Sequence, residues 1–542
     1  MNMLIFSKRL LCGIYILKLI YEEVCCEQVP CAARSYGQSS VICVCNATYC
    51  DTVEPESRLT QGYANMFIST LAGQRLEKSV INFTQQPSKS AQVTLEVKPQ
   101  IIYQTMLGFG GAFTDATGIN ILSLSLPAQY HLIQSYFGRP GLEYTLGRIP
   151  MASCDFSTHP YSYDDNPGDL DLANFSLTME DIRYKVKAVI QTVIAKSCDC
   201  RLMIPIIQKA QSMNRHNISL FGSPWSAPAW MKTSKNMTGY GTLIGNPGGP
   251  HYKAWAKYFV RFLEEYRKHN ITLWGLTAQN EPTDGYIHNF PFQAMGWYPD
   301  QQRDFIALDL GPAMKAGGFS DVRLMILDDT RLNLPYWAEK VFSQQSNASM
   351  YVSGIAVHWY EDFIAPTLSL DVTHKEYPDK FILATEACIT NNFPSKVSLG
   401  NWENAEKYTH SIIEDASHWV TGWSDWNMAL DMEGGPNWVN NFVDSPVIVN
   451  AKADEFYKQP MFYAMGHFSK FVTPGSQRIE MSQVTSLEGF ESIAFQRPDG
   501  SLAVVILNRG TSPVLTAIHD PVVGYLNQTV PPRSLITFTW WR

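Results

Sequence analysis

Short apolar runs recur along the middle of this chain, and most of them end in polar or glycine-rich residues. Amphipathic segments separate most of the runs, such as residues 252–263, whose apolar positions follow helical spacing. Apolar runs alternating with helices are typical of parallel strands that are buried on both faces. The expected strands are Thr105–Phe113, Tyr144–Met151, Ser219–Trp225, Leu273–Glu281, Arg323–Asp328, Gly354–Tyr360, Phe381–Glu386 and Val420–Asn427. Eight such units predict a (β/α)₈ TIM barrel.

The pattern changes from about residue 477, where strand-like runs are joined by turns such as Pro498-Asp499-Gly500. The strands expected there are Phe490–Gln496, Ser501–Leu507, Val514–Ile518 and Ser534–Trp541. Before the barrel, residues 91–97 alternate between apolar and polar positions, as a half-buried strand does. Because both stretches flank the barrel, we expect them to form one antiparallel β-sandwich domain.

The chain is therefore expected to divide into four parts. These are a signal peptide at 1–26, a disulfide-rich β module at 27–55 joined by about 428–460, a β-sandwich domain at 56–103 plus 476–542, and a catalytic TIM barrel at 104–427 plus 461–475. A length of 542 residues with 45% hydrophobic and 17% charged residues fits a large globular domain with smaller companions. The net charge of −8 gives no electrostatic case for nucleic acid as a partner.

The N-terminus has the pattern of a signal peptide. Lys8 and Arg9 precede the apolar stretch Leu10–Ile20, which is too short to span a bilayer. Lys18 interrupts this stretch, and a start-site artefact or an ordinary helix is the alternative; we expect cleavage near Cys26. Eight N-x-S/T sequons are glycosylation candidates: Asn46, Asn82, Asn174, Asn217, Asn236, Asn270, Asn347 and Asn527. Together these features favour a secreted or lysosomal glycoprotein.

Four cysteines crowd into twenty residues: Cys31, Cys43, Cys45 and Cys50. Such a cluster predicts disulfides or a zinc site. The spacing lacks paired C-x-x-C motifs and the signal peptide favours disulfides, for which three pairings are open. Cys154 and Cys388 lie in apolar runs and are expected to be buried thiols.

Two carboxylates carry the candidate chemistry, Glu281 in the fourth run and Glu386 in the seventh. They are 105 residues apart, or about three barrel units of roughly 30–35 residues, so they are expected to face each other across the barrel mouth. Two carboxylates that flank a cleft are the minimum that cleavage of a glycosidic bond requires. Asn280 and Pro282 surround Glu281, and Pro282 favours an extended backbone there, as at a strand end. We expect Glu281 to be the acid/base and Glu386 the nucleophile; a surface Glu before a turn is the alternative at 281.

Residues at other strand ends also fit a sugar site: Arg148, Asp155, Trp225, His358, Tyr360 and Trp426. A buried Arg148 is expected to pair with a carboxylate as structure or to orient the nucleophile. His358 is structural unless the site uses it, whereas Tyr360 is placed to donate a hydrogen bond to the nucleophile. The two tryptophans are either core residues or stacking walls for a sugar.

Several motifs, taken in order, closely resemble the acid β-glucosidases (glucosylceramidases) of glycoside hydrolase family 30. They are Gly108–Asp115, Ser153–Phe156, Asn280–Pro282, His358–Tyr360, Glu386–Cys388 and Gly434–Trp438. The resemblance runs from about Cys31 to Arg542. It implies a retaining β-glucosidase that acts on glucosylceramide, with no metal or organic cofactor.

The resemblance also implies a role for individual positions. Glu281 matches the acid/base and Glu386 the nucleophile. Residues that match the glucose-holding positions are Asp155, Trp225, Asn280, Trp426 and Asn441, and Tyr360 matches an aromatic beside the nucleophile. Phe290 and Phe292 lie in the loop that lines the aglycone entrance, where the family's usual residue at 290 is Tyr. The resemblance pairs Cys31 with Cys43 and Cys45 with Cys50, and it implies a saposin-type activator, anionic lipid at a membrane surface, and the lysosome.

One segment departs from the family pattern. Val186–Met203 resembles an insertion of 18 residues, which is a gene-model error, a lengthened helix or a surface loop. Two other functions compete with the main hypothesis: a relative that cleaves β-xylosides or β-1,6-glucans, and a catalytically dead sugar-binding or trafficking protein. Retention of Glu281, Glu386, Asn280 and Tyr360 argues against the dead protein.

Overall fold

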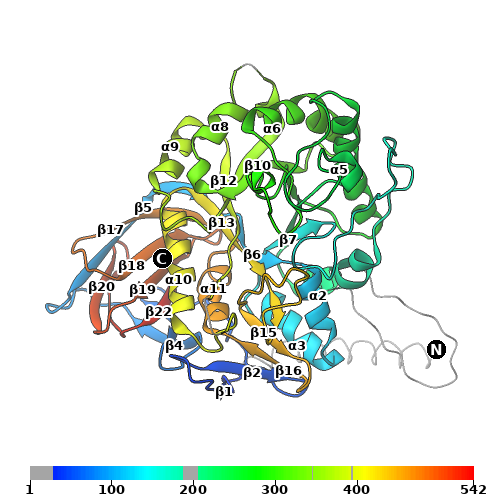
Figure 1. Cartoon of the computed structure of the whole chain (residues 1–542). Coiled ribbons are helices and arrows are strands. Elements are labelled where there is room, and N and C mark those ends of the chain that lie inside the picture. Colours follow the sequence, from blue (N-terminus) through cyan, green and yellow to red (C-terminus); the bar gives the residue numbers. More distant parts are fainter. Residues whose placement is uncertain (1–27, 187–205, 345, 392–394) are drawn as a thin grey trace, which may run out of the picture.

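The computed structural model describes residues 28–186, 206–344, 346–391 and 395–542 (Figure 1). The predicted signal peptide and nearly all of the predicted insertion lie outside these residues. Within the described ranges, no helix combines the length and the apolar character that crossing a membrane requires.

Eight parallel strands close into a barrel, as the sequence predicts. In chain order they are β6 Gly108–Ala112, β7 Leu146–Met151, β8 Ser219–Pro224, β9 Gly275–Thr277, β10 Arg323–Thr330, β11 Val352–His358, β12 Phe381–Glu386 and β13 Val420–Asn427. Each overlaps one of the eight predicted runs, so the glutamates belong to the fourth and seventh units. The fourth strand is much shorter than predicted, because the chain leaves regular strand geometry after Thr277.

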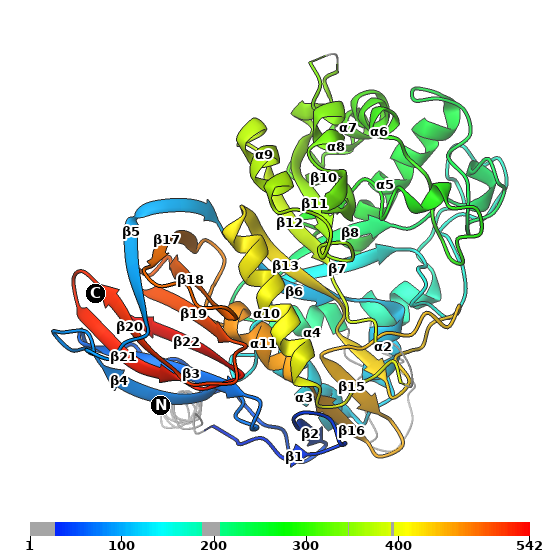
Figure 2. The same ribbon diagram turned by 60° about the vertical axis from the view of Figure 1, so that its left-hand side comes forward.

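Helices surround the barrel and connect it to the β-sheets (Figure 2). They are α2 Asp115–Leu122, α3 Leu126–Phe137, α4 Ile206–Met213, α5 Pro250–Lys268, α6 Pro299–Phe305, α7 Gly311–Ala316, α8 Tyr336–Val341, α9 Leu368–Glu376, α10 Trp402–Ser417 and α11 Pro460–Ser469. The predicted helix at 252–263 is confirmed as part of α5. Its buried Tyr252, Trp255, Phe259, Phe262 and Tyr266 recur every three or four positions, so they lie on one face.

A nine-stranded sheet combines segments from before and after the barrel. Its strands are β3 Tyr63–Thr70, β4 Glu77–Asn82, β5 Val93–Thr105, β17 Gln477–Gln483, β18 Phe490–Gln496, β19 Leu502–Asn508, β20 Val514–Asp520, β21 Gly524–Val530 and β22 Ser534–Trp540. The long β5 pairs antiparallel with β17 and parallel with β20. Helix α10 contacts both β13 of the barrel and β18 and β19 of this sheet, which fixes the two units against each other.

Sequence patterning missed β17 and β21. Both are mostly half-buried along their length, and neither shows the alternation of buried and exposed positions that a sequence pattern needs. The four C-terminal strands that were predicted are confirmed as β18, β19, β20 and β22, with ends that differ by one or two residues.

A third sheet carries the disulfides. It has the order β1-β2-β16-β15-β14, from β1 Ala33–Arg34, β2 Ile42–Asn46, β14 Ala429–Asp431, β15 Val447–Asn450 and β16 Glu455–Lys458. The bonds join Cys31 to Cys43 and Cys45 to Cys50, which confirms the pairing that the family resemblance implies. Cys154 and Cys388 are buried free thiols, also as predicted.

The eight sequon asparagines differ in their exposure. Six are exposed, whereas Asn46 and Asn527 are half-buried. The amide nitrogen of Asn527, which would carry a glycan, instead donates to Thr84 Oγ1 at 2.8 Å and to the Gln86 carbonyl at 3.1 Å. A glycan at Asn527 would replace one of the two amide hydrogens and so would require at least one of these hydrogen bonds to break.

Candidate active site

Glu386 is the last residue of β12, and its carboxylate is held by two donors. The strand before it is apolar and buried, so Glu386 emerges from the barrel wall with only 5% of its surface exposed. Arg148 Nη1 donates to one carboxylate oxygen, and the Tyr360 hydroxyl donates to the other at 2.7 Å. Burial raises the pKa of Glu386, and the positive charges of Arg148 and His358 act against that rise.

Arg148 joins several parts of the site from within β7. It is fully buried, and its Nη2 donates to Asp328 Oδ2 at 2.9 Å and to Asn280 Oδ1 at 2.8 Å. Its Nε donates to Ser223 Oγ at 3.1 Å. The planar guanidinium therefore fixes Glu386, Asp328 and Asn280 relative to one another.

Asp328 is a buried carboxylate that the sequence reasoning did not select. Its two oxygens accept from Thr277 Oγ1 at 2.6 Å and Thr385 Oγ1 at 2.7 Å, in addition to Arg148. Burial favours the neutral acid, but Arg148 and His358 outweigh it and hold the pKa of Asp328 well below its ordinary value. Its position at the end of the fifth predicted strand was the one indication that the sequence offered.

Glu281 stands on a strained turn four residues beyond β9. Its φ of 39° is in the left-handed region, so the extended backbone expected from Pro282 is wrong. The Glu281 N–H donates to the Asp328 carbonyl at 2.9 Å, and the Asp284 N–H donates to the Glu281 carbonyl at 3.0 Å. These bonds to β10 and to the following turn hold a backbone conformation that Glu rarely adopts.

His358 is the last residue of β11 and lies between Glu281 and Asp328. Its Nδ1 is 3.0 Å from Glu281 Oε1, and its Nε2 is 3.1 Å from Asp328 Oδ1. Burial lowers the pKa of His358, but the surrounding carboxylates outweigh burial and raise it to about 10. Burial raises the pKa of Glu281, and the hydrogen bond and charge of His358 reverse this and lower it.

The two glutamates are close enough for one substrate bond. A carboxyl oxygen of each, together with a ring nitrogen of His358, lies within 4.8 Å of the others. A separation of about 5–5.5 Å is typical of a nucleophile and acid/base pair, whereas a water-activating pair is about 6.5–9.5 Å apart. Arg148 and His358 supply positive charge beside Glu386 and Glu281, respectively. A second cluster, Cys45, Cys50 and Asp51, has both sulfurs in a disulfide.

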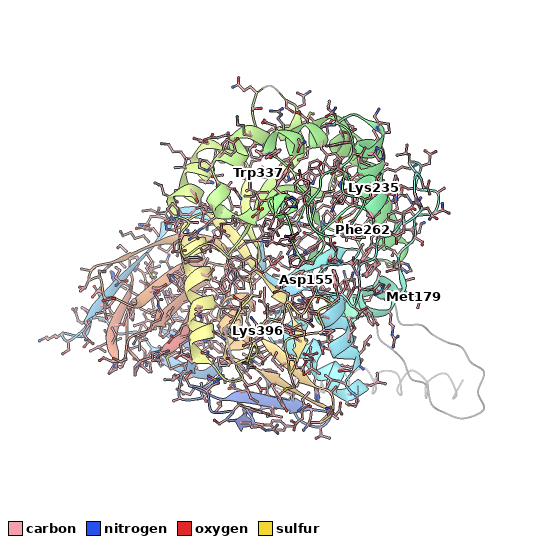
Figure 3. All side chains as sticks on the ribbon, in the orientation of Figure 1. Asp155, Met179, Lys235, Phe262, Trp337 and Lys396 are labelled. Atoms are coloured by element: carbon pink, nitrogen blue, oxygen red, sulfur yellow. A yellow bond between two sulfur atoms is a disulfide. The ribbon has the colours of Figure 1, made fainter. Side chains whose placement is uncertain are left out.

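The predicted glucose-holding residues form a wall next to this pair. The rings of Trp225 and Trp426 stack with centroids 5.0 Å apart, and Arg148 lies over them at 4.9 and 5.3 Å. Asp155, labelled in Figure 3, is buried and accepts from Asn441 and Asn437, each at 3.0 Å. Burial raises the pKa of Asp155 to about 7.

The predicted aglycone residues lie in the loop after β9. Phe290 and Phe292 meet edge to face with centroids 4.4 Å apart. Phe292 packs against the buried cluster that contains both tryptophans, so this loop adjoins the predicted sugar wall. Asn437, which donates to Asp155, was not predicted as a site residue and appeared only within the motif Gly434–Trp438.

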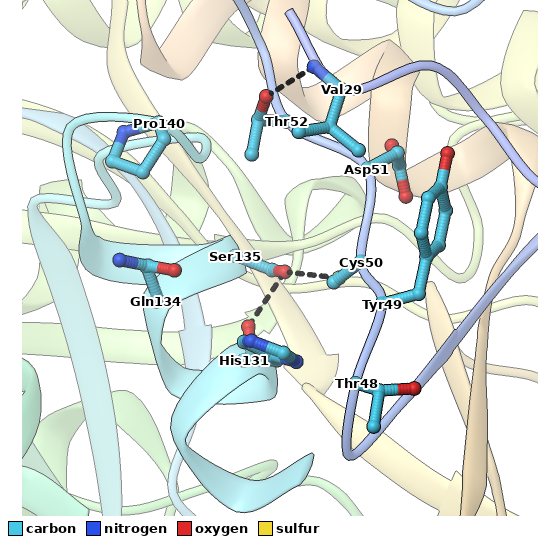
Figure 4. Close-up of a pocket in the computed structure, with 10 residues that line it drawn as sticks. All are labelled: Val29, Thr48, Tyr49, Cys50, Asp51, Thr52, His131, Gln134, Ser135 and Pro140. Atoms are coloured by element: carbon cyan, nitrogen blue, oxygen red, sulfur yellow. Dashed lines mark hydrogen bonds between the residues drawn. The ribbon is translucent and has the colours of Figure 1, made fainter. Parts of the chain in front are cut away.

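Two cavities show where other space is available. One of about 440 Å³ is lined by Tyr360, Cys388 and Phe363 among others, and so adjoins the Glu386 side of the site. The other, of about 450 Å³, lies between residues 48–52 and α3 (Figure 4). His131 and Ser135 line this second cavity, and none of the predicted sugar-site residues does.

A TIM barrel with two close carboxylates at or just beyond its strand ends is the arrangement that glycoside hydrolases use. The chain belongs to glycoside hydrolase family 30. It matches the model of the glycosyl hydrolase family 30 TIM-barrel domain over residues 106–197 and 189–472, and that of the family 30 beta sandwich domain over 475–538. The barrel match is split within 186–203, the segment predicted to be an insertion.

Individual relatives agree with this assignment. The chain is 47% identical to lysosomal acid glucosylceramidase of Mus musculus, with 95% of this chain and 96% of the relative covered. The crystal structure of SrfJ from Salmonella typhimurium is similar with a TM-score of 0.78 and 27% identity, covering 89% of this chain and all of SrfJ. The endo-β1,6-glucanase BT3312 is similar with a TM-score of 0.75 and 25% identity, covering 89% and 100%.

Proposed function

We propose that this enzyme is a retaining β-glucosidase that hydrolyses glucosylceramide to glucose and ceramide. The observation that carries the proposal is the approach of Glu281 and Glu386, since one carboxyl oxygen of each lies within 4.8 Å of the other. At that spacing one carboxylate reaches the anomeric carbon while the other reaches the leaving oxygen.

The two donors that hold the Glu386 carboxylate suggest that Glu386 is the nucleophile, which leaves Glu281 as the proton donor in the first step. Glu386, oriented by Arg148 and Tyr360, attacks the anomeric carbon and forms a glucosyl ester. Glu281 donates a proton to the glycosidic oxygen, so that ceramide leaves as a neutral alcohol. In the second step Glu281 takes a proton from water, and the water oxygen attacks the same carbon, which releases glucose with its β configuration and frees Glu386.

The substrate is inferred from the relatives and from the walls of the site. The mouse relative carries the name glucosylceramidase. Stacked Trp225 and Trp426 offer apolar faces for a sugar ring, and Phe290 and Phe292 offer an apolar entrance for a lipid chain. We include in the proposal delivery to the lysosome, a membrane-bound substrate, and help from anionic lipid and a saposin-type activator.

Action on another β-glycoside is the second candidate. The similarity to an endo-β1,6-glucanase favours it, because a similar fold there serves a polysaccharide. A catalytically dead protein would have no physical need for two opposed carboxylates with dedicated donors.

Turnover measurements with purified protein test the proposal. Glucosylceramide, aryl glucosides, aryl xylosides and β-1,6-glucan oligosaccharides are compared at acidic pH, with and without vesicles that contain anionic lipid. We expect glucosylceramide to be cleaved fastest, with stimulation by the vesicles and β-glucose as the first product by NMR. Faster cleavage of the glucan, or α-glucose as the first product, would contradict the proposal.

A further inference from the structure

Two loops at the C-terminal face of the barrel run side by side. Residues 232–243 follow β8 and fold back on themselves as a hairpin, which we call the β8 loop. Residues 285–296 follow β9 and carry Phe290 and Phe292, and we call them the entrance loop. Four backbone N–H groups donate from one loop to the other: Gly239 to Phe292 at 3.0 Å, Ala294 to Met237 at 3.2 Å, Gly241 to Gly285 at 2.9 Å and Gly296 to Gly241 at 2.8 Å.

The ammonium group of Lys232 is buried between these loops. Its Nζ donates to the Ala294 carbonyl of the entrance loop at 2.6 Å and to the Met237 carbonyl of the β8 loop at 3.0 Å. None of the surface of Lys232 is exposed. Burial lowers the pKa of Lys232 to about 7, and no charge on the described residues acts against this. At acidic pH two carbonyls therefore hold the buried charge, which is costly unless both hydrogen bonds are kept.

The entrance loop places aromatic rings beside the proposed sugar site. Phe292 packs against the buried cluster that contains Trp225 and Trp426, as Tyr360 does, and Phe290 meets Phe292 edge to face. Neither catalytic glutamate belongs to this loop. A small shift of the loop therefore changes the contact between these rings and a leaving group, while the two carboxylates keep their positions.

The entrance loop is also attached on its other side. Gln293 Nε2 donates to Ser153 Oγ at 2.8 Å and to the Cys154 carbonyl at 3.1 Å, next to Asp155. Because this attachment does not involve Lys232, loss of the Lys232 ammonium should shift the loop rather than release it.

We propose that Lys232 is a positioning residue that gives the enzyme its preference for apolar leaving groups. Its ammonium group holds the entrance loop against the β8 loop, which keeps Phe290 and Phe292 in contact with an alkyl chain that extends from the sugar. The inference rests on the proposed function, which supplies the lipid leaving group. Loss of the ammonium is expected to weaken the dependence of catalysis on chain length, rather than catalysis itself.

The test uses Lys232→Met, which keeps a long unbranched side chain and removes both hydrogen bonds. Values of kcat/KM are measured for alkyl β-glucosides from ethyl to octyl, whose leaving groups have almost the same reactivity and differ in length. Each methylene that is buried against the rings contributes roughly fourfold to kcat/KM. We expect the octyl-to-ethyl ratio to fall roughly tenfold, as contact with one or two methylenes is lost, and kcat/KM for the ethyl glucoside to change by less than about threefold.

Lys470→Met is the matched control. Lys470 is also buried, and its Nζ donates to the carbonyls of Arg139 at 2.7 Å and Gly141 at 2.9 Å and to Glu143 at 3.2 Å, between α3 and β7. We expect this variant to lose stability and to keep the native octyl-to-ethyl ratio. Lys232→Gln serves as a second variant, and thermal unfolding confirms that each variant is folded.

A double variant shows whether Lys232 acts through the entrance loop. Phe292→Ala removes one of the two rings and should lower the octyl-to-ethyl ratio by itself. Adding Lys232→Met should then lower the ratio by less than about twofold more, because the two changes affect the same contact. A general loss of stability would not make the second change depend on the first.

Three results would overturn the inference: an unchanged ratio in both Lys232 variants, an equal fall in Lys470→Met, or the full additional loss in the double variant. The native protein is measured first. If it cleaves no β-glucoside, the proposed function fails and the inference fails with it. If it is active and favours the octyl glucoside, and the Lys232 variants keep that preference, the inference alone fails.

Discussion

The surroundings of Glu386 and of Glu281 differ more than their shared chemistry suggests. Glu386 ends a regular buried strand, and two donors with fixed positions hold its carboxylate. Glu281 stands on a left-handed turn, where its carboxylate meets His358. A rigid strand end suits a nucleophile that must point at one carbon. A turn beside a histidine suits a group that must gain and lose a proton in each cycle.

Removal of the nucleophile is expected to have the largest effect. Glu386→Gln leaves a side chain of the same shape that cannot form the glucosyl ester, so turnover should fall about 10⁵-fold. Rates with an aryl glucoside, together with a thermal unfolding curve, check the prediction. Near-native turnover would show that Glu386 is not the nucleophile.

The next largest effect is expected at Glu281. Glu281→Gln should slow cleavage of glucosylceramide by about 10²- to 10⁴-fold. The first step with 2,4-dinitrophenyl β-glucoside should be nearly unchanged, because dinitrophenolate leaves without being protonated. Steady-state rates and the burst of dinitrophenol separate the two steps. Equal losses with both leaving groups would mean that Glu281 is not the proton donor.

Tyr360→Phe should have a smaller effect on the Glu386 side. The lost hydrogen bond to a charged group is worth about 1.5–3 kcal/mol, or roughly 10- to 100-fold in kcat/KM. Tyr266→Phe is a matched control, because the Tyr266 hydroxyl donates to Asp181 at the same 2.7 Å but on α5. Equal losses in both variants would show that the effect is on the fold.

The smallest effect is expected in the free energy of unfolding, when His358 beside Glu281 is replaced. The folded protein raises the pKa of His358 from 6.5 to about 10, so the stabilisation is complete below pH 6.5 and is lost as pH rises through 10. His358→Gln should therefore be less stable than the native protein at pH 5–6, with a gap that narrows towards pH 10. Urea unfolding at several pH values measures this gap, and a constant gap would refute the charged histidine.

The sequence predicted the parts of the site that depend on strand ends. Glu386, Arg148 and Tyr360 were found because an apolar run with a polar end has a visible pattern. Asp328 was missed, because its importance comes from contacts between strands that no periodicity describes. The backbone at Glu281 was predicted wrongly, since the local preference of a residue before proline gave way to hydrogen bonds from Asp284 and to β10.

The fold shows the same division. The barrel strands are buried on both faces and could be counted from the sequence, whereas the half-buried β17 and β21 could not. The shortness of β9 also escaped prediction, because residues 278–281 are joined to β8 and β10 by single backbone hydrogen bonds outside the regular ladder, which no sequence pattern reveals.

Trapping of the covalent intermediate tests the assignment of the two regions most directly. A 2-deoxy-2-fluoro-β-glucoside with a good leaving group should form a glucosyl ester that hydrolyses slowly, and mass spectrometry of the digested protein locates it. We expect the label to be on Glu386. We also expect the loss of turnover to be proportional to the fraction of protein that is labelled. A label on Glu281 or on any other residue would contradict the account.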